Sequence, residues 1–195
     1  LSNPHNPGGN VWRREELKKM GELCVRYGTK IIADEIHSDI VCQPHEYVPM
    51  ASLSDEIAHH TITFIAPSKT FNVAGLSSSL AITVDENMKK EFNTMMDRLH
   101  ISNGNIFGSV AFEAAYNQGD EWLDQLMDYL KSNLAFLTET INEKIEGIEV
   151  IQPEGTYLAW LDCRGLPLEK EKIHEFMIHN AGLGLSNGTS FGENG

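Results

Sequence analysis

Three short apolar segments rich in β-branched residues alternate with stretches of helical periodicity, and this alternation constrains the fold more than any other feature. The segments are Lys30–Ala33, Thr61–Ala66 and Leu80–Val84. Each has the length of a strand, and nearly continuous apolar character is typical of a strand buried on both faces. Strands that alternate with helices indicate an α/β fold with substantial parallel pairing.

Apolar residues at helical spacing predict five helices. They cover residues 11–27, 86–99, 107–117, 120–146 and 169–180. The first carries Leu17, Met20, Cys24 and Tyr27 on one face, and the second carries Met88, Phe92, Met95 and Leu99 after Asp85 as a candidate cap. Two further strands are expected at 148–151 and 156–161. We place a boundary near residue 120, so that residues 1–120 belong to a large domain and residues 121–195 to a smaller α+β domain.

The charge and the cysteine content exclude several classes of protein. The chain has 195 residues and a formal net charge of −13. This charge argues against binding to nucleic acid or to an anionic membrane surface, since both require basic patches. No apolar run reaches about 18 residues, so no membrane span is expected. Cys24, Cys42 and Cys163 lie far apart, which fits a protein of the reducing cytoplasm.

Three loops that carry chemically useful side chains follow predicted strands or open the chain. They are Asn3–Gly9, Asp34–Asp39 and the stretch around Lys69. Open α/β sheets bind ligands at the carboxyl ends of their strands, so an amide, a carboxylate and a lysine would meet in one crevice. Simpler readings exist: the Asn-Pro-rich loop is a strong turn signal, and Asp34 could be an ordinary helix cap. A single histidine among carboxylates is weak evidence for a metal, and we predict no metal site.

Taken together, the three loops resemble a known family. "NPHNPGG", "DEIHSD" and "PSKTFNVAGL" occur in this order with family-like spacing, and they are similar to the motifs of the class I and II aminotransferases. These enzymes have fold type I and depend on pyridoxal phosphate. The form "DEIH" and the stretch "TYLAWLDCR" resemble the cystathionine β-lyase or C–S lyase subgroup. The resemblance covers essentially all 195 residues.

The resemblance implies a role for five residues. Lys69 matches the lysine that holds the cofactor covalently and acts as the catalytic base. Asp34 matches the carboxylate that pairs with the pyridine nitrogen, and Asn6 matches the residue that hydrogen-bonds the 3-hydroxyl oxygen. His37 stands where many aminotransferases have a tyrosine on that same oxygen. Ser68 matches a ligand of the phosphate.

The chain also departs from the family pattern. Ser77 stands where many aminotransferases carry an arginine for the phosphate, and the arginine for the substrate carboxylate would lie beyond residue 195. The chain opens without methionine and closes on a turn-rich stretch at residues 191–195. We therefore expect a piece of a longer enzyme that lacks the N-terminal half, and we expect this piece alone to be inactive.

Three functions follow as expectations from the resemblance. The leading one is a cytoplasmic, pyridoxal-phosphate-dependent lyase that acts on a small amino-acid substrate, cystathionine or a related cysteine conjugate, and forms a homodimer. The second is an aminotransferase of the same fold. The third is a regulator or binding protein that kept the fold without the activity.

Overall fold

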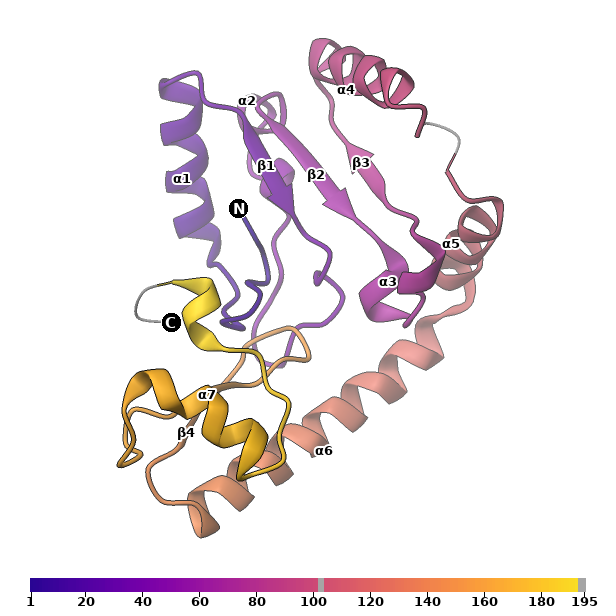
Figure 1. Ribbon diagram of the computed structural model, residues 1–195. Coiled ribbons are helices and arrows are strands. Elements are labelled where there is room, and N and C mark those ends of the chain that lie inside the picture. The colour runs from indigo at the N-terminus through magenta and orange to yellow at the C-terminus, as the bar shows by residue number, and fades with distance from the viewer. Residues whose placement is uncertain (102–103, 193–195) are drawn as a thin grey trace. The chain divides into compact units, whose positions relative to one another are not determined.

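The computed structural model describes residues 1–101 and 104–192, so the predicted turn-rich end at 191–195 lies partly outside the described residues. Helices and strands alternate up to the third strand, after which three helices follow one another (Figure 1). The helices are α1 (Arg14–Arg26), α2 (Asp55–Ala58), α3 (Pro67–Thr70), α4 (Glu86–Arg98), α5 (Ile106–Gln118), α6 (Asp120–Lys144) and α7 (Lys170–His179). The strands are β1 (Ile31–Asp34), β2 (Thr61–Ile65), β3 (Leu80–Ile82), β4 (Glu149–Ile151) and β5 (Trp160–Asp162).

The first three strands form one sheet in the order β1-β2-β3 (Figure 1). β1 pairs in parallel with β2, with Ile31 opposite Thr61 and Asp34 opposite Phe64. The N-terminal residues extend the sheet, because Ser2 forms a parallel bridge with Asp34. Parallel pairing brings the carboxyl ends of these segments to one edge of the sheet.

The third strand differs from the expected parallel pattern. β3 pairs antiparallel with β2, with Thr63 opposite Ile82 and Ile65 opposite Leu80. Only the N-terminal segment, β1 and β2 therefore end at the common edge of the sheet. The α/β prediction holds, with β3 as one antiparallel edge strand. Antiparallel edge strands are common on otherwise parallel sheets.

A compact apolar core joins α1 to the sheet. Leu17 of α1 packs with four other buried residues, Ile31, Ala33, Met50 and Ile57. The predicted face of α1 is confirmed at Leu17, which is fully buried, but Tyr27 is 72% exposed. Tyr27 lies just beyond the helix and serves as its C-cap residue, so it does not follow the helical face.

A buried carboxylate holds the segment that follows β1. Glu35 is almost completely buried and accepts hydrogen bonds from the Tyr47 hydroxyl and, at 2.9 Å, from the Met50 amide. Burial raises the pKa of Glu35, and these two hydrogen bonds partly oppose that rise. Burial and the contact with Glu35 also raise the pKa of Tyr47. The hydrogen bonds of Glu35 with Tyr47 and Met50 hold residues 41–50 against the core.

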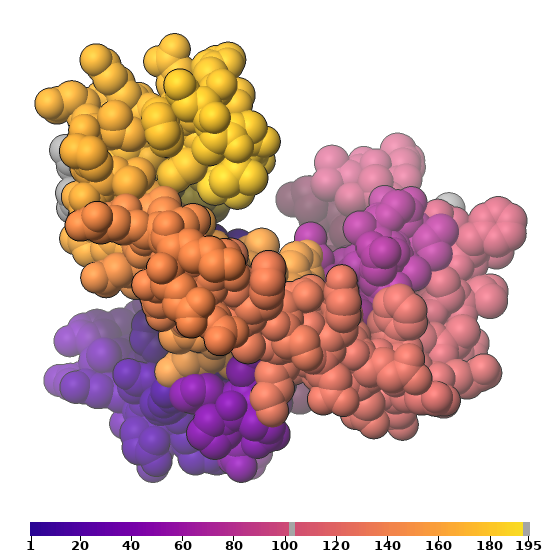
Figure 2. All heavy atoms as spheres, turned by 90° about the horizontal axis from the view of Figure 1, so that it is seen from below, coloured from indigo at the N-terminus to yellow at the C-terminus, as the bar shows by residue number. Residues whose placement is uncertain are grey.

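The chain divides into two compact units. One comprises residues 1–134 and 152–160, and the other comprises residues 135–151 and 161–195, with its described part ending at 192. The division falls within α6, whose side chains form a continuous band on the surface shown in Figure 2. The boundary between a large and a smaller domain near residue 120 stays a prediction. None of the helices in the described ranges is both long and apolar enough to cross a membrane.

Most predicted helices are confirmed within a few residues, whereas the last two strands are shorter than expected. Asp85 caps α4 as predicted, accepting a hydrogen bond from the Met88 amide at 2.7 Å. The face of α4 is half-buried at Met88 and Phe92 but exposed at Met95 and Leu99. The strand expected at 156–161 begins only at Trp160, because residues 152–158 instead pack against the first unit's N-terminal segment.

Gly9 makes this packing possible. Its carbonyl accepts hydrogen bonds from the amides of Glu154 and Gly155, at 2.8 and 2.9 Å. Gly9 has φ of +77°, and a Cβ atom there would lie 2.6 Å from the Cβ of Pro153. Only glycine combines this backbone conformation with so close an approach. The segment 152–158 is thereby fixed against the loop Asn3–Gly9.

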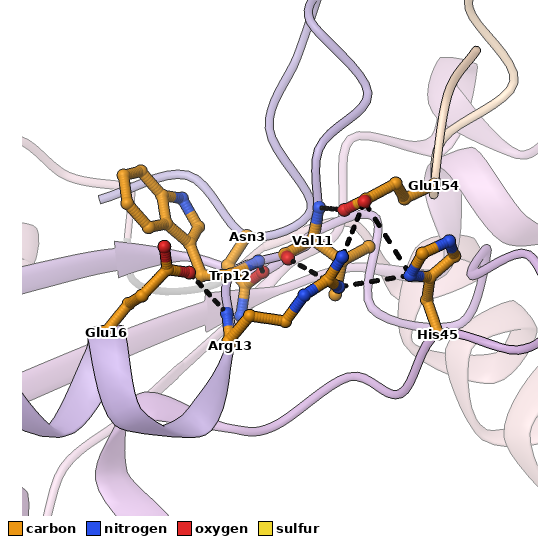
Figure 3. A network of polar contacts seen from close by, with 7 residues as sticks. All are labelled: Asn3, Val11, Trp12, Arg13, Glu16, His45 and Glu154. Atoms are coloured by element: carbon orange, nitrogen blue, oxygen red, sulfur yellow. Dashed lines mark hydrogen bonds and ion pairs between the residues drawn. The ribbon is translucent and has the colours of Figure 1, made fainter.

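A polar network reinforces the same junction (Figure 3). The Glu154 carboxylate accepts hydrogen bonds from the Val11 amide at 2.8 Å and from Arg13 at 2.6 Å, and it lies 3.7 Å from His45 Nδ1. Partial burial raises the pKa of Glu154, but the two hydrogen bonds and the charges of His45 and Arg13 outweigh it. The net result is a pKa below the usual value.

The core position of Leu17 gives a test of the fold. Leu17→Ala should lower the free energy of unfolding by about 2–5 kcal/mol, because it leaves a cavity where α1 meets the sheet. Urea denaturation followed by circular dichroism measures this loss. Leu23→Ala on the same helix is the control, since Leu23 is 47% exposed. Equal losses for the two variants would contradict the assigned core.

The Glu154 network predicts a pH-dependent contribution to stability. A carboxylate with a lowered folded-state pKa stabilises the protein above its unfolded-state pKa, and this contribution disappears as the pH falls through the folded-state value. Glu154→Gln should therefore lower the urea midpoint at pH 7 and change it much less at about pH 3. Glu46→Gln, on an exposed residue of the neighbouring segment, is the control. A Glu154→Gln effect that is the same at both pH values would refute the assignment.

Candidate functional site

The three predicted loops begin at the same edge of the sheet. Asp34 ends β1, and Ser2, which pairs with it, leads directly into the loop Asn3–Gly9. β2 ends at Ile65, and two residues later Pro67 begins α3, which carries Lys69. The parallel pairing of β1 and β2 therefore places the Asp34 and Lys69 segments side by side.

Asp34 presents an exposed carboxylate at this edge. Its amide donates to the Leu1 carbonyl at 2.8 Å, and its carbonyl accepts from the Asn3 amide at 3.0 Å. Its Oδ1 atom accepts a hydrogen bond from the Ile36 amide at 3.2 Å. The residues after Asp34 form turns and not a helix, so Asp34 orients a turn and is not a helix cap. Its backbone is fixed while the carboxylate stays accessible.

His37 is the most unusual side chain of the site. It is only 2% exposed, and both its ring nitrogens lack a hydrogen-bond partner among the described residues. Its ring meets the Tyr157 ring edge-on, with 5.5 Å between centroids. Burial and the charge of Lys69 lower the pKa of His37, and the charge of Asp34 partly opposes this. The imidazole is therefore neutral near pH 7 and has an unused donor and acceptor.

Lys69 lies half-buried on α3, close enough to act electrostatically on His37. Within the described ranges its amine makes neither a hydrogen bond nor an ion pair, which is unusual for a partly buried lysine. Asp34 acts on the same histidine. The charges of the Lys69 amine and the Asp34 carboxylate thus both act on the neutral imidazole of His37. Ser68 precedes Lys69 on the same turn and is also half-buried.

The two asparagines of the first loop have different environments. Asn3 is buried, donates to the Val48 carbonyl and accepts from the Trp12 amide, both at 3.2 Å. Asn6 lies in an exposed turn, and its side chain makes no hydrogen bond with the described residues. Asn3 therefore holds the loop, whereas the Asn6 amide is accessible to a ligand.

The structure adds two residues that sequence reasoning missed. Asp39 accepts a hydrogen bond from Thr70, the neighbour of Lys69, and Tyr157 contacts His37. Both belong to the quoted motifs "DEIHSD" and "TYLAWLDCR", but nothing in either motif indicated these contacts. Ser77 lies exposed with φ of +48° after the turn Ala74–Leu76. Across residues 1–101 and 104–192, no three histidine, cysteine or acidic side chains gather as metal ligands would.

Comparisons with known proteins agree with this geometry. The chain is 38% identical over 195 residues to the cystathionine β-lyase PatB of Bacillus subtilis (strain 168), covering 100% of this chain and 50% of PatB. A solved structure of a pyridoxal-phosphate-bound putative aminotransferase from Clostridium difficile 630 matches with a TM-score of 0.96. It is 45% identical, and the match covers 98% of this chain and 50% of that one.

Cystalysin from Treponema denticola, whose crystal structure contains a pyridoxal 5′-phosphate cofactor, matches with a TM-score of 0.94. It is 32% identical, and the match covers 100% of this chain and 49% of cystalysin. The chain thus spans about half the length of the curated relatives it matches. The family model for aminotransferase class I and II matches residues 1–195, and the chain belongs to this family.

Proposed function

We propose that the full-length protein carrying this chain is a pyridoxal-phosphate-dependent carbon–sulfur lyase. It would act on L-cystathionine or a related cysteine S-conjugate by β-elimination. The observation that carries the proposal is the grouping of Lys69, Asp34 and a neutral, buried His37 at one edge of the sheet. The likeness to the cystathionine β-lyase PatB supports the reaction type.

The residues of this edge fit pyridoxal phosphate. Lys69 has an amine free of other partners among the described residues, and this amine would hold the cofactor covalently. The accessible carboxylate of Asp34 would pair with the pyridine nitrogen. The unpaired ring nitrogens of His37 and the accessible amide of Asn6 would serve the 3-hydroxyl oxygen, and the Ser68 hydroxyl would bind the phosphate.

Each residue would contribute a defined physical effect. The negative charge of Asp34 favours a protonated partner, since opposite charges stabilise each other at short range. A neutral His37 can donate a hydrogen bond without adding positive charge beside Lys69. Lys69 Nζ would take the proton from the substrate Cα. The cofactor, when bound, supplies an electron sink for the electron pair left at Cα.

The proposed overall reaction needs no oxidant or reductant. L-cystathionine and water give homocysteine, pyruvate and ammonia. The bond between Cβ and sulfur breaks with its electron pair leaving on sulfur, and water supplies the keto oxygen of pyruvate as ammonia leaves. Whether β-elimination or transamination dominates depends on small differences between their activation barriers, since about 1.4 kcal/mol changes a rate tenfold.

An aminotransferase is the second candidate. The C. difficile protein, at 45% identity, is described as a putative aminotransferase. The same lysine and carboxylate would serve transamination, in which the amino group passes to a keto acid instead of leaving as ammonia. The requirement for a keto acid therefore separates the two candidates.

We also propose that the enzyme is cytoplasmic and homodimeric. All three cysteines are free, which suits a reducing compartment. Large apolar side chains at the start of α5 are strongly exposed, with Ile106 at 80% and Phe107 at 77%. Such apolar surface favours burial against another surface, which the rest of the full-length chain or a second copy in the dimer would supply.

The role of Lys69 can be tested by covalent trapping. Borohydride reduction of the full-length protein loaded with pyridoxal phosphate should yield a stable adduct, which peptide mass spectrometry should locate on Lys69. Lys69→Ala should lose this adduct and lower turnover by about 10³-fold or more, because one amine serves as anchor and base. Lys18→Ala, on the exposed face of α1, is the control. An adduct on another lysine would overturn the assignment.

The reaction type can be tested by omitting the keto acid. With L-cystathionine alone, the full-length enzyme should release pyruvate, ammonia and free thiol in equal amounts over many turnovers, because elimination needs no amino-group acceptor. Lactate dehydrogenase coupling and a thiol reagent measure two of these products. Turnover that stops after one equivalent and resumes when a keto acid is added would identify an aminotransferase.

A further inference from the structure

The turn that carries Lys69 is held by a hydrogen bond from the next residue. Thr70 is 1% exposed, and its hydroxyl donates to Asp39 Oδ2 at 2.8 Å. Asp39 lies in the loop after β1, five residues beyond Asp34. The hydrogen bond therefore connects the segment of the carboxylate directly to the segment of the lysine.

Two aromatic residues make further contacts, one with this turn and one with Asp39. The Trp122 indole donates to the Thr70 carbonyl at 3.1 Å, and the Tyr116 hydroxyl lies 3.5 Å from the same Asp39 oxygen. Burial, the charge of Asp39 and this contact raise the pKa of Tyr116 to about 12, so the hydroxyl keeps its proton and can only donate to Asp39 when the two interact. The Phe71 ring also meets the Tyr116 ring edge-on, with 5.6 Å between centroids.

Gly119 allows these aromatic residues to close on the turn. A Cβ atom at this position would lie 2.3 Å from Phe71 Cε1 and 2.3 Å from the Ala115 carbonyl oxygen. Phe71 follows the turn directly, so α3 is enclosed by the loop after β1 and by the junction of α5 and α6. Because α3 is only four residues long, its direction depends on these contacts and not on its own helical hydrogen bonds.

We propose that Asp39 is a positioning residue that acts through Thr70 to aim the side chain of Lys69. Thr70 and Lys69 are adjacent on one short turn, so a rotation of this turn moves the lysine amine relative to Asp34 and His37. This inference rests on the proposed function, because it concerns the lysine that would hold the cofactor. A misplacement of a reacting group by about 1 Å can cost about 100-fold in rate.

The test compares variants with and without the hydroxyl of Thr70 in the full-length protein. The cofactor is first removed, pyridoxal phosphate is added, and samples are reduced with borohydride at intervals to measure the rate of adduct formation on Lys69. Thr70→Val should slow this rate and kcat by about 10- to 100-fold with little change in KM, because it removes the hydrogen bond but keeps the side-chain volume. Thr70→Ser should restore both to within about threefold of the original protein, since it keeps the hydroxyl.

Thr61→Val is the matched control. The Thr61 hydroxyl is equally buried and donates to the Ile57 carbonyl at 2.7 Å, but Thr61 begins β2, at the end away from α3. It should lower stability about as much as Thr70→Val and leave adduct formation unchanged. If the two valine variants have the same urea midpoint and the same rate of adduct formation, the positioning role is refuted.

A double-mutant cycle tests whether Asp39 acts through Thr70. Asp39→Ala alone should slow adduct formation about as much as Thr70→Val, and the double variant should be no slower than either, because both changes remove one interaction. Multiplicative losses would overturn the proposed link. If the original protein forms no Lys69 adduct, the proposed function and this inference both fail. A normal adduct with unchanged rates in Asp39→Ala and Thr70→Val would refute the positioning role alone.

Discussion

The parallel pairing of β1 with β2 is the constraint on which the site depends. It sets Asp34 opposite Phe64, so the chain leaves both strands at the same edge and must place the next residues there. The bridge between Ser2 and Asp34 brings a third segment to that edge. Without this pairing, Asp34 and Lys69 would be carried by unrelated turns. The proposed chemistry therefore depends on backbone hydrogen bonds between short strands.

The candidate residues lie in loops, at the end of β1 or on the short helix α3, and each of these segments is fixed by its own contacts. Glu35 fastens residues 41–50, Glu154 and Gly9 fasten residues 152–158, and Asp39 fastens the turn of Lys69. A reactive group on a loop keeps its geometry only when neighbouring groups hold the loop. Here each of these anchors is a polar contact to a residue distant in the sequence.

Much of the fold could be predicted because local patterns and final structure agree. The β-branched segments formed strands, and the helix predicted over residues 120–146 formed as the single long helix α6. The antiparallel direction of β3 could not be predicted, because an apolar strand has the same pattern in either direction. The late start of β5, at Trp160 instead of Thr156, could not be predicted, because Thr156 adopts φ of +69° in a segment whose partners lie more than 100 residues earlier.

The candidate site was predictable only in part. Asp34, His37 and Lys69 belong to ordered motifs, so the resemblance identified them and parallel pairing explains their grouping. The burial of His37, with two unpaired ring nitrogens, depends on Tyr157 and on contacts that no local pattern encodes. The hydrogen bond of Thr70 to Asp39 was hidden for a similar reason, since a threonine beside a lysine has no distinctive signature. Its partner, Asp39, lies 31 residues away.

The buried pair of Glu35 and Tyr47 has a consequence for folding accuracy. Asp34 and Glu35 are consecutive carboxylates with opposite environments, the first exposed and the second buried. A slip of β1 by one residue would exchange them, because side chains alternate between faces along a strand. The slipped chain would put the Asp34 carboxylate, on a side chain one methylene shorter, in the buried position of Glu35, and each of the two donors, Tyr47 and Met50, that it failed to reach would cost about 1–3 kcal/mol. The buried contacts of Glu35 thus disfavour the misregistered strand and keep the Asp34 carboxylate facing outward.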